Sequence, residues 1–352
     1  MKIPNSLYLF KELLQTSFTE PEDDYDSDDD TYLEESKGKY LKAYMIESHR
    51  KIQETPIDNY TIWKKFEDAD TWYYSIDNET NLKFFVVDAT SPRVWILYSI
   101  LNVNEVDKIV KKLVKSTSKL DYCWLSRGLL ESFKKHIGWK EKGIGLRYRN
   151  ILSDQDDRAT LSLKAWYGSN RIKGWDAFIE QAKEQVTISS IRWKKIIDGQ
   201  TRITSEWYNY GKVTITASED IEETLRAITS MARHYEKLLV EATKLRDESF
   251  GAFELNFTQD INLDSFSEAV SMGKSAMNLW LTETESESDF KRFRGVDMHT
   301  WDVVFLDLGV DYAYLTIPGK GCVNAAPRIA TIQAEYTAGK TDIYFNGDEI
   351  FV

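Results

Sequence analysis

The lysines between residues 108 and 119 are the residues whose type and spacing point most directly to a function. Lys108, Lys112, Lys115 and Lys119 are separated by four, three and four residues, which places them on one face of a helix. At 1.5 Å per residue such a row extends about 16 Å, comparable with several phosphate spacings along a nucleic-acid strand. We expect the row to contact nucleic acid or an acidic partner protein; the alternative is an ordinary solvated helix face.

The row belongs to a strongly basic segment inside an acidic chain. The 352 residues carry 57 acidic and 45 basic side chains, a net charge of −12, yet residues 108–150 carry 12 basic and three acidic side chains, a net charge of +9. Trp124, Trp139 and Tyr148 lie among these cations, and aromatic rings near cations can stack on bases. The residues predicted to bind nucleic acid are Lys108, Lys111, Lys112, Lys115, Lys119, Arg127, Arg147 and Arg149.

A second candidate lies in the loop of residues 318–328, which contains two glycines and leads into a predicted helix. Backbone N–H groups at a helix N-terminus attract anions, so Lys320 and Arg328 are predicted to bind a small anion such as phosphate. Cys322 is also a candidate nucleophile, activated by the helix end and by His299, with Asp297 as third member. The alternative is an ordinary strand-to-helix turn with a buried cysteine.

Sequence motifs for other reactions are absent. The chain has no Walker A, GxSxG, HExxH or GxGxxG motif, and its four histidines lack metal-ligand spacing. The aspartates at 302, 307 and 311 would suit a metal, but no (D/E)-x-K element follows them. We therefore predict no metal and no cofactor, and we favour a protein without catalytic activity.

Residues 20–35 form a dense acidic run with six aspartates between positions 23 and 30. Like charges at this density repel one another and bury nothing, so the run is predicted to be a mobile linker or tail. Its alternate residues match calcium-loop ligand positions, but Asp29 stands where such a loop requires glycine. The run either competes with nucleic acid for the basic segment or serves only solubility.

The elements that position these side chains mix strands and helices. Segments 83–89 and 93–100 are predicted to be two strands joined by a short turn. The helix that carries the lysines follows, with Asn104 as its N-cap and apolar residues on the face opposite the lysines. Further predicted elements are a helix over 124–135, strands over 144–152 and 160–167, and a short helix over 174–185.

The middle of the chain predicts a meander closed by a long helix. Strands are expected over 186–197, 201–208 and 212–217, with a hairpin turn at Asp198–Gly199, since both residues tolerate positive φ. Apolar residues then recur at alternating spacings of four and three from Ser218 to Arg246, which predicts the long helix. We expect this helix to cover the antiparallel sheet; the alternative is pairing with a partner helix.

The C-terminal third predicts a β-α-β-β-β-α-β order that resembles an elaborated ferredoxin-like sandwich. Its strands are expected over 253–257, 278–282, 301–308, 312–317 and 342–345, its helices over 264–272 and 326–336, and residues 283–294 as a loop. The chain as a whole is predicted to be α+β, with antiparallel sheets covered by helices. The predicted domains are an N-terminal segment (1–59) with the acidic linker, an α+β domain (60–250) and a C-terminal α+β domain (251–352).

The expected cellular compartment is inferred from three sequence features that the chain lacks. The N-terminus has no signal-peptide apolar core, no stretch approaches eighteen uncharged apolar residues, and two cysteines cannot build a disulfide framework. We expect a cytoplasmic, non-catalytic binding protein or complex subunit whose partner is nucleic acid or an acidic protein, and no membrane. The alternatives are an enzyme with its site around Cys322 and His299, or a purely structural subunit that uses the long helix as its interface.

Overall fold

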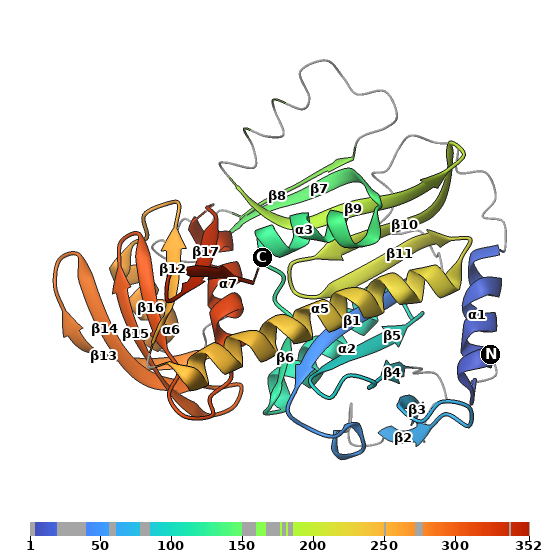
Figure 1. The fold of residues 1–352 in the computed structure, drawn as a ribbon, viewed down its shortest axis with the longest axis horizontal. Coiled ribbons are helices and arrows are strands. Elements are labelled where there is room, and N and C mark those ends of the chain that lie inside the picture. Colours follow the sequence, from blue (N-terminus) through green and yellow to red (C-terminus); the bar gives the residue numbers. More distant parts are fainter. Residues whose placement is uncertain are drawn as a thin grey trace. The chain divides into compact units, whose positions relative to one another are not determined.

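The computed structural model describes most of the chain (Figure 1). The described residues are 4–19, 40–55, 61–77, 85–149, 160–166, 177, 181, 186–249, 251–271, 277–337 and 339–351. The acidic run of residues 20–35 and nearly all of the predicted helix over 174–185 therefore lie outside the described residues.

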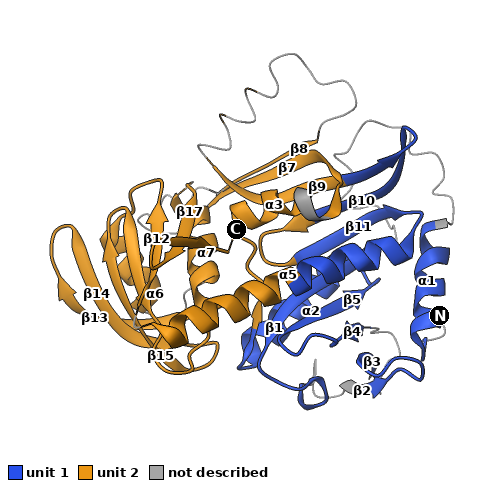
Figure 2. Ribbon diagram, in the orientation of Figure 1, with its two compact units in different colours: residues 1–120, 194–206, 212–233 blue, residues 121–193, 207–211, 234–352 orange. Residues whose placement is uncertain are grey.

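The chain forms two compact units, each assembled from separate segments (Figure 2). Unit 1 comprises Met1–Leu120, Lys194–Glu206 and Lys212–Arg233, and unit 2 comprises Asp121–Trp193, Trp207–Gly211 and His234–Val352. The three consecutive domains expected from the sequence, 1–59, 60–250 and 251–352, stay a prediction. Strands β9 (Thr187–Ile197) and β10 (Gln200–Tyr208) and helix α5 (Ile221–Glu248) each contribute residues to both units.

Unit 1 is an antiparallel sheet with helices. Its strand order is β2-β3-β4-β5-β1-β11, followed by the parts of β10 and β9 nearest their connecting turn. The registers of β1 with β5 and with β11, and of β2 through β5, are all antiparallel. The elements are α1 (Leu7–Thr19), β1 (Leu41–Ser48), the 3-10 helix η2 (Ile52–Glu54), β2 (Thr61–Lys65), β3 (Trp72–Asp77), β4 (Val86–Asp88), β5 (Val94–Ser99), α2 (Val103–Ser116) and β11 (Lys212–Ser218).

The structure of unit 1 confirms some predicted elements and adds others. The strands predicted over 83–89 and 93–100 are β4 and β5, which pair with Val86 opposite Tyr98. Helix α1 and strand β1 were not predicted, although β1 pairs with strands on both sides and all eight of its residues are buried. Lys42 and Glu47 interrupt the apolar character of β1, which hides it in the sequence.

Unit 2 combines the remaining strands of the first sheet with a second sheet. Strands β8 and β7 lie next to the first part of β9, and β7 pairs with β8 in antiparallel register. The elements are β6 (Leu120–Tyr122, whose Leu120 belongs to unit 1), α3 (Arg127–Ile137), β7 (Lys140–Arg149), β8 (Thr160–Trp166), β12 (Phe253–Phe257), α6 (Leu263–Ser271), β13 (Leu279–Ser286), β14 (Phe290–Asp297), β15 (Asp302–Gly309), β16 (Tyr312–Thr316), α7 (Ala325–Thr337), β17 (Thr341–Phe345) and β18 (Asp348–Ile350).

Three elements run through both units: β9 (Thr187–Ile197), β10 (Gln200–Tyr208) and α5 (Ile221–Glu248). The hairpin turn between β9 and β10 is confirmed, since Asp198 and Gly199 have φ values of 51° and 79°. The long helix is confirmed as α5, and its apolar stripe is buried within the chain. The stripe consists of Ile221, Leu225, Ile228, Ala232, Tyr235, Leu239 and Ala242.

The second sheet lies wholly in unit 2 and has the order β13-β14-β15-β16-β12-β17-β18. Burial alternates along its strands, as in β12 and β17, so one face forms the core, and α7 packs against β12 and β17. The loop predicted over 283–294 is wrong, because these residues extend β13 and form β14. The two strands pair across the turn, with a register irregularity between Glu283 and Glu285.

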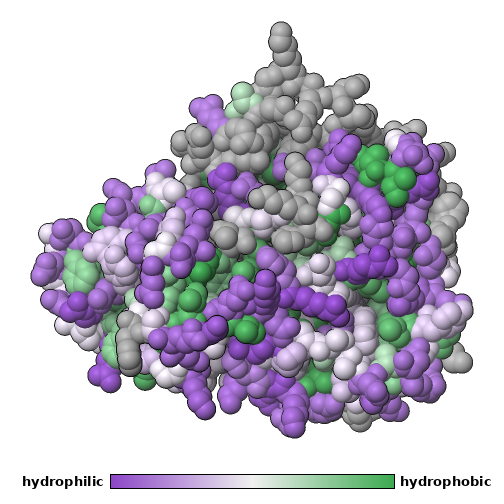
Figure 3. Space-filling view, viewed as in Figure 1, coloured by the Kyte–Doolittle hydropathy of each residue, from purple (hydrophilic) through white to green (hydrophobic). Residues whose placement is uncertain are grey.

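The described chain is thus α+β with antiparallel sheets, as predicted. No helix among the described residues combines the length and the apolarity that a membrane span requires. On the face seen in Figure 3, hydrophilic residues predominate and hydrophobic ones form small separate patches.

Candidate nucleic-acid interface

Helix α2 of unit 1 presents the predicted lysines. Its N-cap is Asn102, whose side chain accepts a hydrogen bond from the Asn104 backbone N–H at 2.9 Å, so the predicted cap at Asn104 is two residues late. The helix buries Val106, Val110, Leu113 and Val114. The helix face opposite these buried residues carries the lysines.

The lysine row consists of Lys108, Lys111, Lys112, Lys115 and Lys119, and all five side chains are exposed. Lys119 does not belong to the helix as predicted, because α2 ends at Ser116 and Lys119 has a φ of 69°. The four lysines on the helix lie within about 100° of one another around its axis and extend about 10 Å along it. The row is shorter than expected but wider, because Lys111 belongs to it.

No described residue forms an ion pair with any lysine of the row. Other lysines of the chain have such partners: Lys11 contacts Glu222, and Lys212 contacts Asp107 of α2 itself at 2.7 Å. The carboxylate of Asp107 also accepts a hydrogen bond from the Tyr44 hydroxyl. The acidic residue nearest to the row in sequence is thus already bound, and the row is a concentrated positive surface.

The rest of the basic segment lies in unit 2, where two of its arginines lie near carboxylates. Arg127 begins α3 and its Nε lies 3.3 Å from Glu131, while Arg147 lies 3.9 Å from Glu335. Arg149 belongs to β7, but its side chain is not among those that the structure describes. Trp139, predicted to stack on bases, is only 2% exposed and belongs to the core. The structure therefore separates the predicted residues into an exposed lysine row in unit 1 and individual arginines in unit 2.

The candidate anion ligand Arg328 lies instead at the centre of a buried polar cluster in unit 2. Its side chain is 0% exposed, with Nη1 2.5 Å from Asp121 and Nη2 2.6 Å from Asp297. Burial alone lowers the pKa of this guanidinium, but the two carboxylates outweigh burial and raise the pKa above its ordinary value. Lys320 is exposed, so the two cations do not form one accessible anion site.

Further hydrogen bonds tie this cluster together. Asn324 donates to the Asp121 carboxylate and to the Tyr122 backbone carbonyl, both at 3.0 Å. The Tyr235 hydroxyl donates to the Asn324 side-chain oxygen at 2.5 Å and accepts from the Trp124 backbone N–H at 3.0 Å. The cluster joins residues far apart in sequence, and we assign it a structural role.

The candidate nucleophile set lies beside this cluster. Asp297 accepts hydrogen bonds from Arg328 and from the backbone N–H of His299. Asp297 and His299 are 1% exposed and Cys322 is 3% exposed. A substrate reaches such side chains only after local opening, so the structure offers no support for catalysis at Cys322.

Because it is buried, Cys322 should react slowly with a maleimide in the native protein. The measurement uses a Cys123→Ala background, so that Cys322 is the single thiol, and compares native protein with protein unfolded in guanidinium chloride. A native rate close to the unfolded rate would contradict this expectation and favour an activated thiolate.

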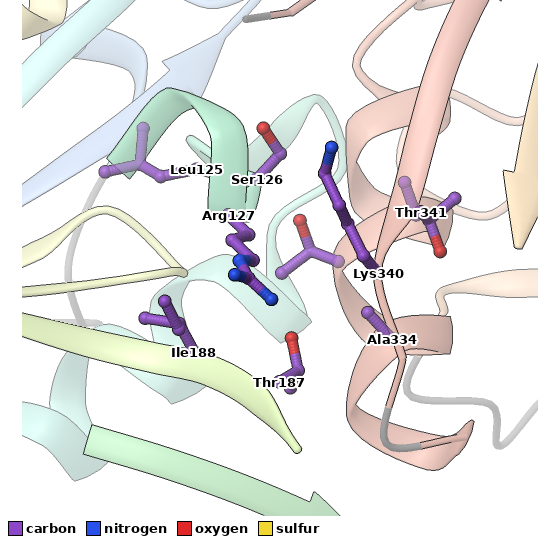
Figure 4. A pocket seen from close by; sticks show the side chains of 10 residues that line it. Leu125, Ser126, Arg127, Thr187, Ile188, Ala334, Lys340 and Thr341 are labelled. Atoms are coloured by element: carbon purple, nitrogen blue, oxygen red, sulfur yellow. The ribbon is translucent and has the colours of Figure 1, made fainter. Parts of the chain in front are cut away.

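A narrow pocket in unit 2 is lined by two cationic side chains (Figure 4). Arg127 from the first turn of α3 and Lys340 from before β17 line it, together with Thr331, whose buried hydroxyl has no hydrogen-bond partner among the described residues. The pocket has room for about one water molecule. Both cations are bound by carboxylates, Lys340 to Asp342 at 2.6 Å. The pocket therefore does not hold a substrate-sized ligand.

Sequence reasoning missed two buried lysines in the sheet of unit 1, Lys42 and Lys212. Lys42 on β1 is 1% exposed and donates hydrogen bonds to the backbone carbonyls of Tyr40 and Leu101 at 2.7 and 2.6 Å. Burial and, to a smaller extent, the nearby Lys212 cation together lower the pKa of Lys42 to about 8.

This lowered pKa predicts a pH dependence of stability. Unfolding returns Lys42 to its ordinary pKa of 10.5, so the unfolded chain binds more protons than the folded one between pH values of about 8 and 10.5. The contribution of Lys42 to the free energy of unfolding should therefore rise as the pH increases through this window. Lys42→Met should remove that rise in urea-unfolding experiments, and an unchanged pH profile would contradict the assignment.

The whole chain is similar to known proteins. Residues 3–350 match the model of the family described as MJECL33-like protein. A relative from Methanocaldococcus jannaschii, described as uncharacterized protein MJECL33, is 22% identical over 358 aligned residues, which cover 88% of this chain and 87% of the relative. No solved structure matches the chain. Because the family match covers nearly every residue, the chain belongs to the MJECL33-like protein family.

Proposed function

We propose that this protein is a non-catalytic binding protein that contacts nucleic acid through the lysine row of α2. The observation that carries the proposal is the exposure of four lysines on one face of α2, and of Lys119 shortly after its end, without an ion-pair partner among the described residues. A chain with a net charge of −12 has no general affinity for polyanions, so its attraction to nucleic acid would be local.

The residue type fits phosphate rather than base recognition. Lysine is a flexible point charge, and the backbone of nucleic acid offers one phosphate at each nucleotide. Such contacts position a strand without reading its sequence. The expected activity is therefore binding without sequence preference.

An acidic protein surface is the second candidate partner, because carboxylates also attract lysines. The two partners differ in charge density, which is higher and more regular along nucleic acid. Binding can be compared by fluorescence anisotropy, using labelled single-stranded and duplex oligonucleotides together with labelled polyglutamate as the mimic of an acidic protein.

The oligonucleotides should bind at low salt, and polyglutamate should bind at least about tenfold more weakly. Equal or tighter binding of polyglutamate would favour the acidic partner. Absence of oligonucleotide binding at low salt would contradict the proposal.

We also propose that the protein works in the cytoplasm as a subunit of a complex. The two buried, unbridged cysteines, Cys123 and Cys322, support a reducing compartment. An enzyme with its site around Cys322 and His299 stays the alternative prediction, with the slow labelling described above as its test.

The ferredoxin-like character of the C-terminal sheet is likewise a proposal. Four neighbouring strands in the order β15-β16-β12-β17 are antiparallel, with α6 after β12 and α7 before β17, which supports this arrangement. The hairpin of β13 and β14 and the strand β18 would then be additions. A crystal structure compared with ferredoxin-like domains tests this assignment.

A further inference from the structure

A second cationic surface lies on unit 2, and its two cations, Lys164 and Arg192, are not among the residues that the sequence singles out. Two cations and two aromatic rings contact one another there, and we call them the cation–aromatic platform: Lys164, Trp166, Arg192 and Tyr208. The guanidinium carbon of Arg192 lies 4.7 Å from the Trp166 ring centroid. The ammonium of Lys164 lies 5.7 Å from the Trp166 ring and 5.7 Å from the Tyr208 ring. These are cation–π distances.

Three more aromatic residues continue the platform. Tyr208 contacts Tyr210 with ring centroids 5.6 Å apart, Tyr210 contacts Tyr122 at 5.7 Å, and Tyr122 contacts Trp124 at 5.9 Å. The planes of these rings are inclined by 40°, 75° and 86°. The last two pairs therefore meet edge to face, and the first pair is tilted.

Strand alternation explains why the platform faces away from the core. Lys164 and Trp166 of β8 flank Ala165, which is buried, and they lie opposite Gly145 and Gly143 of β7. Trp207 is 0% exposed and packs on Phe133 of α3, so its neighbour Tyr208 faces the other side of the sheet. Lys164 is exposed, and the other members of the platform are half-buried.

A glycine makes room for the tryptophan. A Cβ atom added to Gly143 would lie 2.1 Å from Cε3 and 2.8 Å from Cζ3 of Trp166. The indole ring therefore lies across the backbone of β7, and only glycine permits this position. This position holds the half-buried indole ring next to both cations, Lys164 and Arg192.

We infer that the cation–aromatic platform binds the unpaired bases of single-stranded nucleic acid, an inference that rests on the proposed function. Partly exposed rings on a sheet stack on bases of any sequence, and adjacent cations attract the phosphates between those bases. Bases in a duplex are already stacked in the helix and cannot do this. A proline-rich peptide is the other usual ligand of surface aromatics, but it offers no negative charge to Lys164 and Arg192.

The test compares variants in binding to one labelled strand, alone and as a duplex with its complement. Trp166→Ala combined with Tyr208→Ala should weaken single-strand binding about 10- to 100-fold and leave duplex binding unchanged. The matched control is Trp280→Ala with Tyr314→Ala, which removes two exposed rings from the second sheet and should change neither affinity. A second variant, Lys164→Glu with Arg192→Glu, keeps the rings and should also weaken single-strand binding.

The outcomes separate this inference from the proposed function. If lysine-row variants weaken binding but both platform variants bind the single strand normally, the inference is overturned and the proposed function stands. If the wild-type protein binds neither strand nor duplex, both fail. Platform variants that lose binding of a proline-rich peptide, while still binding the single strand, would also overturn the inference.

Discussion

Replacing Arg328 with methionine should lower the free energy of unfolding by about 3–5 kcal/mol. The change leaves the carboxylates of Asp121 and Asp297 buried, 2% and 1% exposed, without the cation that lies within 2.6 Å of each. Isolated buried charges are costly, because neither water nor a counter-ion compensates them. Urea unfolding at neutral pH, followed by tryptophan fluorescence, measures the loss.

Arg292 provides a matched control for this prediction. It also lies between two carboxylates, Glu285 and Asp307, but its side chain is 47% exposed. Because water screens exposed ion pairs, Arg292→Met should lower the free energy of unfolding much less than Arg328→Met does. Adding Asp121→Asn and Asp297→Asn to Arg328→Met should recover part of the loss. If the two single variants were equally stable, the structural role of the buried cluster would be wrong.

The second large effect concerns the lysine row. Changing Lys108, Lys112, Lys115 and Lys119 to glutamine should weaken nucleic-acid binding roughly 100-fold at low salt, because four phosphate contacts are lost. These side chains are exposed, so the variant should fold normally. Fluorescence anisotropy measures affinity, and circular dichroism checks the fold.

The control variant carries the same change in net charge at other places. Lys51, Lys64, Lys237 and Lys244 are exposed and belong to no common row, so their change to glutamine should reduce affinity only slightly. Equal losses in the two variants would mean that total charge, rather than the lysine row, governs binding.

The sequence predicted elements whose periodicity is unbroken. The apolar stripe of α5 and the apolar strands β4 and β5 were found because burial alone determines their pattern. Prediction from periodicity failed at β1, where Lys42 and Glu47 are buried. Their partners, the carbonyls bound by Lys42 and the guanidinium of Arg93 bound by Glu47, are distant in sequence and cannot be read from the local pattern.

The error over 283–294 has a different cause. Its acidic and basic halves were interpreted as a solvated loop, but Glu285 lies opposite Arg292 and Lys291 bonds Glu283 across the β13–β14 hairpin. Opposite charges at matching distances from a turn indicate paired strands. No such local pattern exists for Arg328, because its partner Asp121 is 207 positions away in the chain.

Candidate sites were predictable only where they are local. The lysine row lies within twelve consecutive residues, and helical spacing identified most of it, although Lys119 lies beyond the helix and Lys111 was left out of the row. The cation–aromatic platform combines β8, β9 and β10, so only strand pairing brings its members together. Aromatic residues two positions apart, as at Tyr122 and Trp124 or Tyr208 and Tyr210, are the one sequence signal that it offers.

The salt dependence of nucleic-acid binding tests the central claim most directly. The logarithm of the association constant, plotted against the logarithm of salt concentration, has a slope that counts phosphate contacts, about 0.7–0.9 for each. The slope for the lysine-row variant should be smaller than that of the wild type by about 3, whereas the control variant should retain the wild-type slope. Identical slopes for the wild type and the lysine-row variant would contradict phosphate binding by α2.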